Sequence, residues 1–286
     1  MPNHLLRSSF VILAVCLAAC QKETATPSQS TPAATLPEHL TLGNPSGATP
    51  AATQPTNYLL SKPQYALSYH RDQGKPNWVS WHLSSSWIGN AARQDDFRPD
   101  ADLPSTWYHV TASSYTGSGF DRGHNCPSAD RTSTVADNSA TFFMSNMMPQ
   151  APRNNQQTWA NLEDYCRTLL TPGNELYIIC GSYGRGGTGS NGYATTIDGG
   201  RVTVPAHCWK VVVILPNGSD DASRVTSTTR VIAVDTPNDN TLSTNWGTYR
   251  TSIDAIETAT GLDILSAVSI ATQQAIEARI DNGPTN

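Results

Sequence analysis

The sequence carries more strand-like apolar runs than helical ones, and this limits its fold more than any other feature. Such runs are rich in aromatic and β-branched residues and end at turn residues, which is typical of strands. We expect strands at 65–69, 78–83, 141–144, 176–181, 209–215 and 230–234. Because helical segments are fewer and the two types are mixed in order, the chain is predicted to be α+β, with a central, largely antiparallel sheet flanked by helices.

One helix is clear in the middle of the chain. Apolar residues recur at helical spacing from Thr158 to Leu170, and Pro172-Gly173 ends the pattern. Glu163 and Arg167 are four positions apart and therefore lie one above the other, which by itself indicates only a helix-stabilising ion pair. Asn155 lies near the start of this helix, so Asn155 and Glu163 could meet the same ligand from successive turns.

The first 20 residues are predicted to be a lipoprotein signal peptide. The apolar run at 5–19 is too short for a comfortable membrane span and fits the core of a signal peptide. It ends in Leu17-Ala18-Ala19-Cys20, which resembles the bacterial lipobox, so Cys20 is the expected lipidation site. An ordinary cleaved secretory signal is the alternative. Gln21 in place of Asp favours the outer membrane, and we expect an exported, outer-membrane-anchored lipoprotein, or otherwise a secreted protein.

The rest of the chain divides into a linker and one domain. Residues 21–56 are rich in Thr, Pro, Ala, Ser and Gln and predict a flexible linker. The remaining residues, 57–286, are expected to form a single domain that begins near Tyr58. In a chain of 286 residues, a hydrophobic content of 38% is enough for one sizeable core.

Four cysteines lie in the predicted domain, at positions 126, 166, 180 and 208. In an oxidising compartment, four cysteines allow three pairings, and the sequence does not choose among them. No CxxC pair is present, which argues against a structural zinc site. Cys126 is either part of a bridge that braces the nearby His124 or a small buried residue.

The stretch Gly119-Phe120-Asp121-Arg122-Gly123-His124-Asn125 concentrates the chemistry of the chain. Two glycines permit an unusual backbone around a histidine that can move protons near neutral pH. Asp121 could orient the His124 ring or hold Arg122. Arg122 could grip a phosphate in a bidentate manner.

A second polar block follows, and its Asn155 lies about 30 residues after His124. It contains Asn146, Gln150 and Asn155, and Glu163 and Arg167 come after it in the helix. Neutral oxygen ligands and a carboxylate beside arginines suit a hard cation and a phosphodiester better than they suit zinc. The net charge of -5 counts mildly against a nucleic-acid partner, but a bound divalent cation would bring its own positive charge.

With these residues assembled, the chain resembles the DNA/RNA non-specific endonuclease family, the sugar-non-specific nucleases of the ββα-metal (His-Me finger) fold. The family's Asp-Arg-Gly-His motif is matched by residues 121–124. Its Asn…Pro-Gln…Asn…Trp…Leu-Glu block is matched in order by Asn146, Pro149, Gln150, Asn155, Trp159, Leu162 and Glu163. The likeness runs from about Tyr58 to about Leu265 and includes Arg93 upstream.

The resemblance implies a mechanism and a role for each residue. His124 would be the general base, Asn155 the direct ligand of one Mg²⁺, for which Mn²⁺ could substitute, and Glu163 a ligand through water. Contacts to phosphates would come from Arg93, Arg122 and Arg167, and support from Asp121, Asn146 and Gln150. The expected activity is metal-dependent hydrolysis of DNA and RNA with little sequence or sugar specificity, leaving 5′-phosphate ends.

Other functions stay open at this point. One is a catalytically weak, nucleic-acid-binding surface lipoprotein, whose only membrane contact is a lipid on Cys20. Another is a phosphodiesterase that acts on smaller substrates. An inhibitor protein is a further possible partner, whereas the preference for DNA or RNA, the physiological metal and the oligomeric state are not readable from the sequence.

Overall fold

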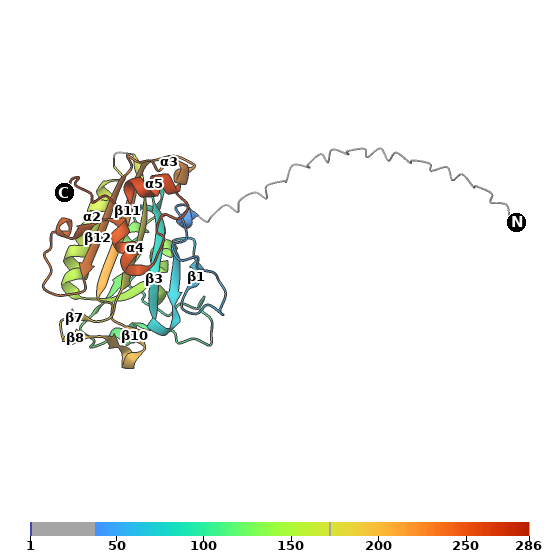
Figure 1. Ribbon diagram of the computed structural model, residues 1–286. Coiled ribbons are helices and arrows are strands. Elements are labelled where there is room, and N and C mark those ends of the chain that lie inside the picture. The colour runs from blue at the N-terminus through green and yellow to red at the C-terminus, as the bar shows by residue number, and fades with distance from the viewer. Residues whose placement is uncertain (2–37, 172, 286) are drawn as a thin grey trace. The chain divides into compact units, whose positions relative to one another are not determined.

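The computed structural model describes Met1 and residues 38–171 and 173–285. Its centre is a seven-stranded sheet in the order β1-β2-β3-β6-β11-β12-β13, in which every pair is antiparallel (Figure 1). The strands are β1 (Tyr58–Ser61), β2 (Ala66–His70), β3 (Lys75–Leu83), β6 (Asn174–Tyr183), β11 (His207–Pro216), β12 (Arg230–Pro237) and β13 (Arg250–Thr251). The α+β class with an antiparallel sheet is thereby confirmed.

The remaining elements surround this sheet. Three two-stranded pairs are β4 (Asp121–His124) with β5 (Met147–Gln150), β7 (Gly187–Gly189) with β8 (Gly192–Ala194), and β9 (Thr196–Ile197) with β10 (Val202–Thr203). The α-helices are α1 (Val135–Ala140), α2 (Ala160–Thr168), α3 (Asp221–Arg224), α4 (Ile253–Thr260) and α5 (Ile270–Ile276). A π-helix, η7 (Asn154–Trp159), leads directly into α2.

The sheet separates two apolar layers, because successive side chains of a strand point to opposite faces. Val212 of β11 packs in one layer together with Trp159 and Leu162, so the η7–α2 segment covers that face. Val211 packs in the other layer together with Ile256, so α4 covers the opposite face. Figure 1 shows α4 and α5 lying along the sheet beside β11 and β12.

The antiparallel β4–β5 pair and η7–α2 form a ββα unit on the α2 face. Asp121 pairs with Gln150, and His124 pairs with Met147. Gly123 allows the two strands to pack closely, because a Cβ at this position would lie 2.3 Å from Gln150 Oε1. The glycine of the motif is therefore required by packing, and its neighbours on β4 carry the chemistry.

The folded domain begins earlier than the sequence predicts. Leu40 and Leu42 fall within the predicted linker, but they are 2% and 1% exposed and pack in the α4 layer of the core. Thr49 forms a backbone bridge with Tyr58, so the segment before β1 is tied to the sheet. The prediction of a linker to residue 56 is therefore wrong from residue 38 on. Residues 2–37 lie outside the described part, and with them Cys20 and nearly all of the predicted signal peptide.

The predicted strand at 141–144 is also wrong. Phe142 lies in a turn, its ring packs against His124, and the strand follows as β5. An apolar run of this length can be a buried turn as well as a strand, because burial alone sets its composition. Elsewhere, β9 and β10 form a hairpin around Asp198–Gly200, and α4 ends at Gly261 in the left-handed conformation.

Cys126, Cys166, Cys180 and Cys208 are all buried free thiols. Cys126 is thus the small buried residue of the two alternatives. Among residues 38–171 and 173–285, no helix combines the length and apolar character that a membrane crossing needs.

Candidate active site

A cleft of about 320 Å³ opens beside the ββα unit, and charged side chains line it. Arg93, Asp121, Arg122 and Asn155 all contribute to its wall. Phe97 and Tyr115 supply apolar surface between them. The cleft therefore brings together four of the predicted site residues from three distant parts of the sequence.

His124 contacts Phe97, which is one of the residues that line this cleft. Its ring packs edge-on against Phe142 at 5.0 Å and against Phe97 at 5.6 Å between ring centroids. Its Nε2 atom is shielded from solvent and has no hydrogen-bond partner in the described part of the chain. Burial, Arg93 and Arg122 lower the pKa of His124 to about 3. A neutral ring with a free Nε2 is the form that accepts a proton.

The lowered pKa gives a first expectation. Between a pKa of about 3 in the fold and the ordinary 6.5, the unfolded chain binds a proton that native His124 does not, so this group favours unfolding as pH falls below 6.5. NMR of the ring signals should show His124 neutral throughout about pH 5–8. His207 is the internal control, because its hydrogen bond to Asp235 raises its pKa. A His124 midpoint near 6.5 would contradict this assignment.

Arg93 and Arg122 each pack on one of the two phenylalanine rings that also contact His124. The Arg122 guanidinium lies 4.2 Å from the Phe97 ring centroid, and that of Arg93 lies 4.9 Å from the Phe142 centroid. Arg93 Nε also donates to Asp95 at 2.7 Å, in a pair whose side chains are 51% and 61% exposed. An ion pair this exposed contributes little to stability, so an incoming phosphate can displace Asp95.

Asn155 is held in place by Asp121. Its Nδ2 donates to Asp121 Oδ2 at 2.8 Å, and Gln156 Nε2 donates to the same oxygen at 2.8 Å. This hydrogen bond uses the amino group of Asn155, so the amide oxygen Oδ1 is the atom that a cation can use. Asp121 therefore braces the start of the helix against β4. Both residues lie on the cleft wall, and their oxygen donors suit a hard cation.

Glu163 is paired with a lysine that the sequence analysis did not single out. Its Oε1 accepts from Lys210 Nζ at 3.0 Å, and the two side chains are 14% and 1% exposed. The ammonium group also lies 4.4 Å from the Trp159 ring centroid. Burial raises the pKa of Glu163, and Lys210 opposes that shift. The second carboxylate oxygen leaves acceptor capacity for water.

The structure does not bring Arg167 into the cleft. One of its amino groups donates to Asp130 at 2.8 Å, and the other donates to Asp164. Asp130 is 2% exposed and also accepts from Trp81, so this pair is part of the domain's interior. In this structure Arg167 therefore braces Asp130, and its contact with a phosphate stays a prediction. A Glu163–Arg167 ion pair is likewise not formed in the described residues.

Asn146 and Gln150 support the site through the backbone and through packing. Asn146 Oδ1 accepts from the Cys126 amide at 3.0 Å, and its Nδ2 donates to the carbonyls of Cys126 and Thr141. It therefore fixes the end of β4 after His124. Gln150 is fully buried against Gly123, and neither of its side-chain polar atoms has a partner among the described residues.

Sequence reasoning missed four residues that shape the site: Phe97, Phe142, Asp130 and Lys210. Lysine in the apolar run of β11 is the one local signal, because a charged residue in a buried strand needs a partner. The others have ordinary surroundings in the sequence.

Comparison with known proteins identifies the family of this chain. The family described as DNA/RNA non-specific endonuclease matches residues 43–270. A protein named Nuclease from Nostoc sp. strain PCC 7120 is 50% identical over 244 residues, which are 85% of this chain and 86% of the relative. Nuclease C1 of Cunninghamella echinulata var. echinulata is 32% identical over 73% of this chain and 82% of its own length.

A solved structure shares the fold. The EndoG chain in a crystal structure of the EndoG/EndoGI complex superposes with a TM-score of 0.64. The match covers 81% of this chain and 91% of the other, at 23% sequence identity. The ββα unit described above is thus that of a ββα-metal nuclease fold.

Proposed function

The chain belongs to the DNA/RNA non-specific endonuclease family, and we propose that it acts as a metal-dependent endonuclease on both DNA and RNA, leaving 5′-phosphate ends. The observation that carries this proposal is the free Nε2 of His124 beside Arg93 and Arg122, next to an Asn155 held by Asp121. A general base, two phosphate-binding cations and an oxygen ligand are the groups that phosphodiester hydrolysis requires.

In this reaction His124 Nε2 takes a proton from the water that attacks phosphorus. The bond from phosphorus to the 3′ oxygen breaks, and the phosphate stays on the 5′ side. Arg93 and Arg122 bind the phosphate oxygens, and their charge-assisted hydrogen bonds strengthen as negative charge builds up. The aromatic rings of Phe97 and Phe142 hold His124 and both arginines in one arrangement.

Asn155 Oδ1 would hold a Mg²⁺ ion directly, with Mn²⁺ as a substitute, and Glu163 would bind one of its waters. When bound, such an ion acts as a Lewis acid for the phosphate and the leaving oxygen. Arg167 holds Asp130 and thereby steadies the helix that carries Glu163.

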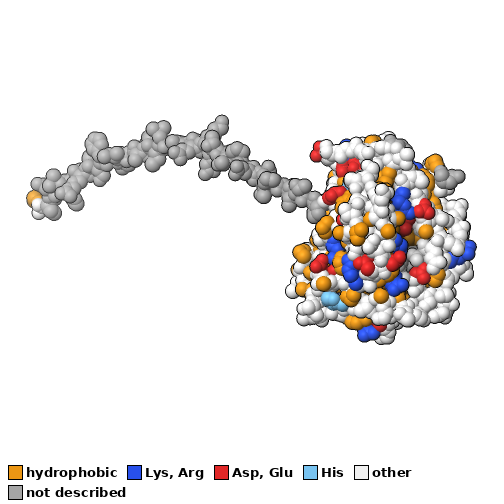
Figure 2. Space-filling model, turned by 180° about the vertical axis from the view of Figure 1, so that it is seen from behind, with side chains coloured by type: hydrophobic (Ala, Val, Ile, Leu, Met, Phe, Trp, Pro, Cys, Tyr) orange, Lys and Arg blue, Asp and Glu red, His pale blue; other side chains and the backbone are white. Residues whose placement is uncertain are grey.

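Contacts with phosphates alone explain low specificity, because phosphates carry no base information. The distribution of charge on the surface is consistent with phosphate binding at the cleft alone. Figure 2 shows acidic and basic side chains intermixed across the middle of one face, without a continuous basic field on that face. Binding strength must then come from the arginines of the cleft and from the cation.

The test uses the chain from residue 21 on, incubated with supercoiled plasmid and with total RNA, in Mg²⁺ and in EDTA. We expect both substrates to be degraded in Mg²⁺ and neither in EDTA, and end-labelling should find 5′-phosphates. Tight binding without cleavage in Mg²⁺ or Mn²⁺ would indicate a nucleic-acid-binding protein instead. Cleavage of small phosphodiesters but not of polymers would indicate a phosphodiesterase.

An Asn155→Ala variant locates the metal in the same assay. We expect its Mg²⁺ requirement to rise by about tenfold or more, since it lacks the one direct ligand. Gln157→Ala is the matched control, because Gln157 is an exposed amide of the same π-helix. An unchanged Mg²⁺ titration in Asn155→Ala would place the ion elsewhere.

Two further proposals concern location and control. We propose that the protein is exported and anchored in the outer membrane by a lipid on Cys20, with secretion as the alternative. We also propose an inhibitor protein as a partner, since the related fold was solved as the EndoG/EndoGI complex.

A further inference from the structure

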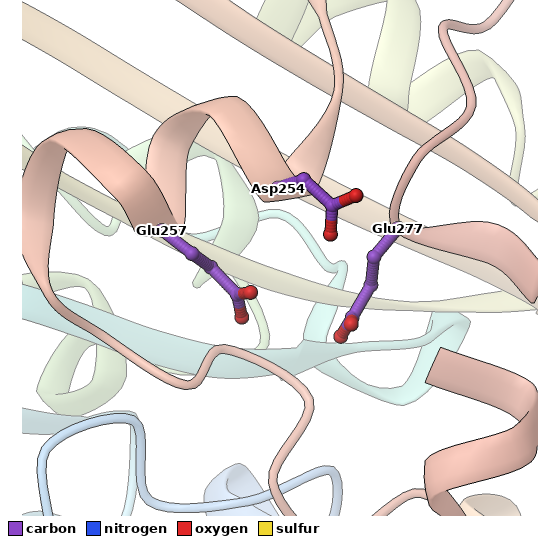
Figure 3. Close-up of side chains that lie close together, drawn as sticks. All are labelled: Asp254, Glu257 and Glu277. Atoms are coloured by element: carbon purple, nitrogen blue, oxygen red, sulfur yellow. The ribbon is translucent and has the colours of Figure 1, made fainter. Parts of the chain in front are cut away.

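A second group of acidic side chains lies outside the cleft. Asp254 and Glu257 come from α4, and Glu277 follows α5. One carboxylate oxygen of each lies within 4.8 Å of those of the other two. Figure 3 shows the three carboxylates facing one common space from two separate segments. Like charges at this spacing repel each other unless a cation compensates them.

Glu277 is the unusual member of this group. It is 6% exposed, and its Oε1 is shielded from solvent and has no hydrogen-bond partner in the described part of the chain. Burial and the neighbouring carboxylates raise its pKa to about 7. A buried carboxylate normally has a hydrogen-bond donor or a cation as partner, because leaving it without one is costly.

Asp254 and Glu257 are also acidic, so neither supplies a positive charge to balance Glu277. Glu257 Oε1 accepts from the Ile264 amide at 2.7 Å, which fixes its carboxylate beside Glu277. No lysine, arginine or histidine of residues 38–171 and 173–285 forms an ion pair with any of the three. Three converging oxygens and no protein cation are the arrangement that a metal ion completes.

We propose that Asp254, Glu257 and Glu277 form a second cation site, distinct from the nuclease centre, that takes Ca²⁺. Ca²⁺ binds carboxylate oxygens at about 2.4 Å, so two of its ligands are at most about 4.8 Å apart. The spacing of the three carboxylates fits this limit. Mg²⁺ needs shorter distances and near-ideal octahedral geometry, whereas Ca²⁺ accepts irregular carboxylate sets completed by water. Asp254 is exposed and leaves access for that water.

The position of the site gives it a structural role. Ile256 of α4 and Ile276 of α5 pack in the same apolar layer, on the face of the sheet opposite α2. An ion bound by Glu277 would join the segment after α5 to α4. Glu277 lies beyond residue 270, where the match to the family ends. Binding there should therefore change stability and leave the nuclease reaction intact.

The test measures Ca²⁺ binding in an Asn155→Ala background, which removes the ligand proposed for the nuclease centre. We expect Ca²⁺ at 100 times its dissociation constant to raise Tm by about 5 °C or more. Equilibrium dialysis should find one Ca²⁺ per chain. Glu277→Gln should weaken this binding at least tenfold and abolish the shift, whereas its Mg²⁺-dependent plasmid cleavage, measured with Asn155 intact, should equal that of the parent.

Asp263→Asn is the matched control, because Asp263 is an exposed acid near the group that contributes no ligand to it. This variant should keep the Ca²⁺ shift. If Glu277→Gln keeps it too, or if the parent binds no Ca²⁺, the proposal is overturned. A third outcome is that Glu277→Gln is more stable than the parent in EDTA and responds to Ca²⁺ as the parent does. The three acids would then only repel one another, and the proposal of a Ca²⁺ site would be overturned.

Discussion

Replacing His124 with Ala should reduce the rate of plasmid cleavage by about 10³-fold, within the range that a positioned general base supplies. The buried Nε2 has no other partner among the described residues, and the pKa of the ring is lowered to about 3, so the neutral form is present at every working pH. The measurement is kcat on supercoiled plasmid under saturating Mg²⁺.

The loss must be separated from misfolding, because the His124 ring also packs on Phe97 and Phe142. His124→Asn keeps a polar side chain in the same space and should lose activity to a similar extent. Both variants should bind plasmid as the parent does and keep its Tm to within a few degrees. His207→Ala is the matched control histidine, since His207 pairs with Asp235 outside the cleft, and it should stay active. Near-full activity in His124→Ala would refute the general-base role.

The second large effect concerns stability. Lys210→Ala should lower the free energy of unfolding by about 3–5 kcal/mol, because it leaves Glu163 in a largely buried position without its cation. The lost contact of the ammonium group with Trp159 adds to this cost. Urea denaturation followed by tryptophan fluorescence measures the change.

A double variant distinguishes this reason from simple loss of packing. Lys210→Met with Glu163→Gln removes both charges and keeps most of the volume, so it should recover most of the stability lost in Lys210→Met alone. Cleavage should remain impaired in the double variant, because Glu163 is proposed to bind a water of the cation. Additive costs of the two single changes would show that the pair is not coupled, and the argument from an uncompensated charge would then be wrong.

The sequence predicted the family and its motifs better than it predicted the domain boundary. His124 and Arg122 share β4, whereas Arg93 and Asn155 reach the same cleft as Arg122 only through the tertiary fold. The linker boundary was wrong, because Leu40 and Leu42 are buried by contacts with distant residues and not by any local pattern. A composition rich in Pro, Thr and Ala does not distinguish a free segment from one that packs on a domain.

The sequence by itself determined the α+β class, the family motif and the residue types of the reaction, because apolar periodicity and motif spacing are local properties of the chain. Only the tertiary structure decided which charges meet. It paired Arg167 with Asp130 and Glu163 with Lys210. It also placed Glu277 beside the two acidic residues of α4. The physical reason is that an ion pair depends on distances of a few ångströms between residues far apart in the chain, which the packing of the sheet and helices sets.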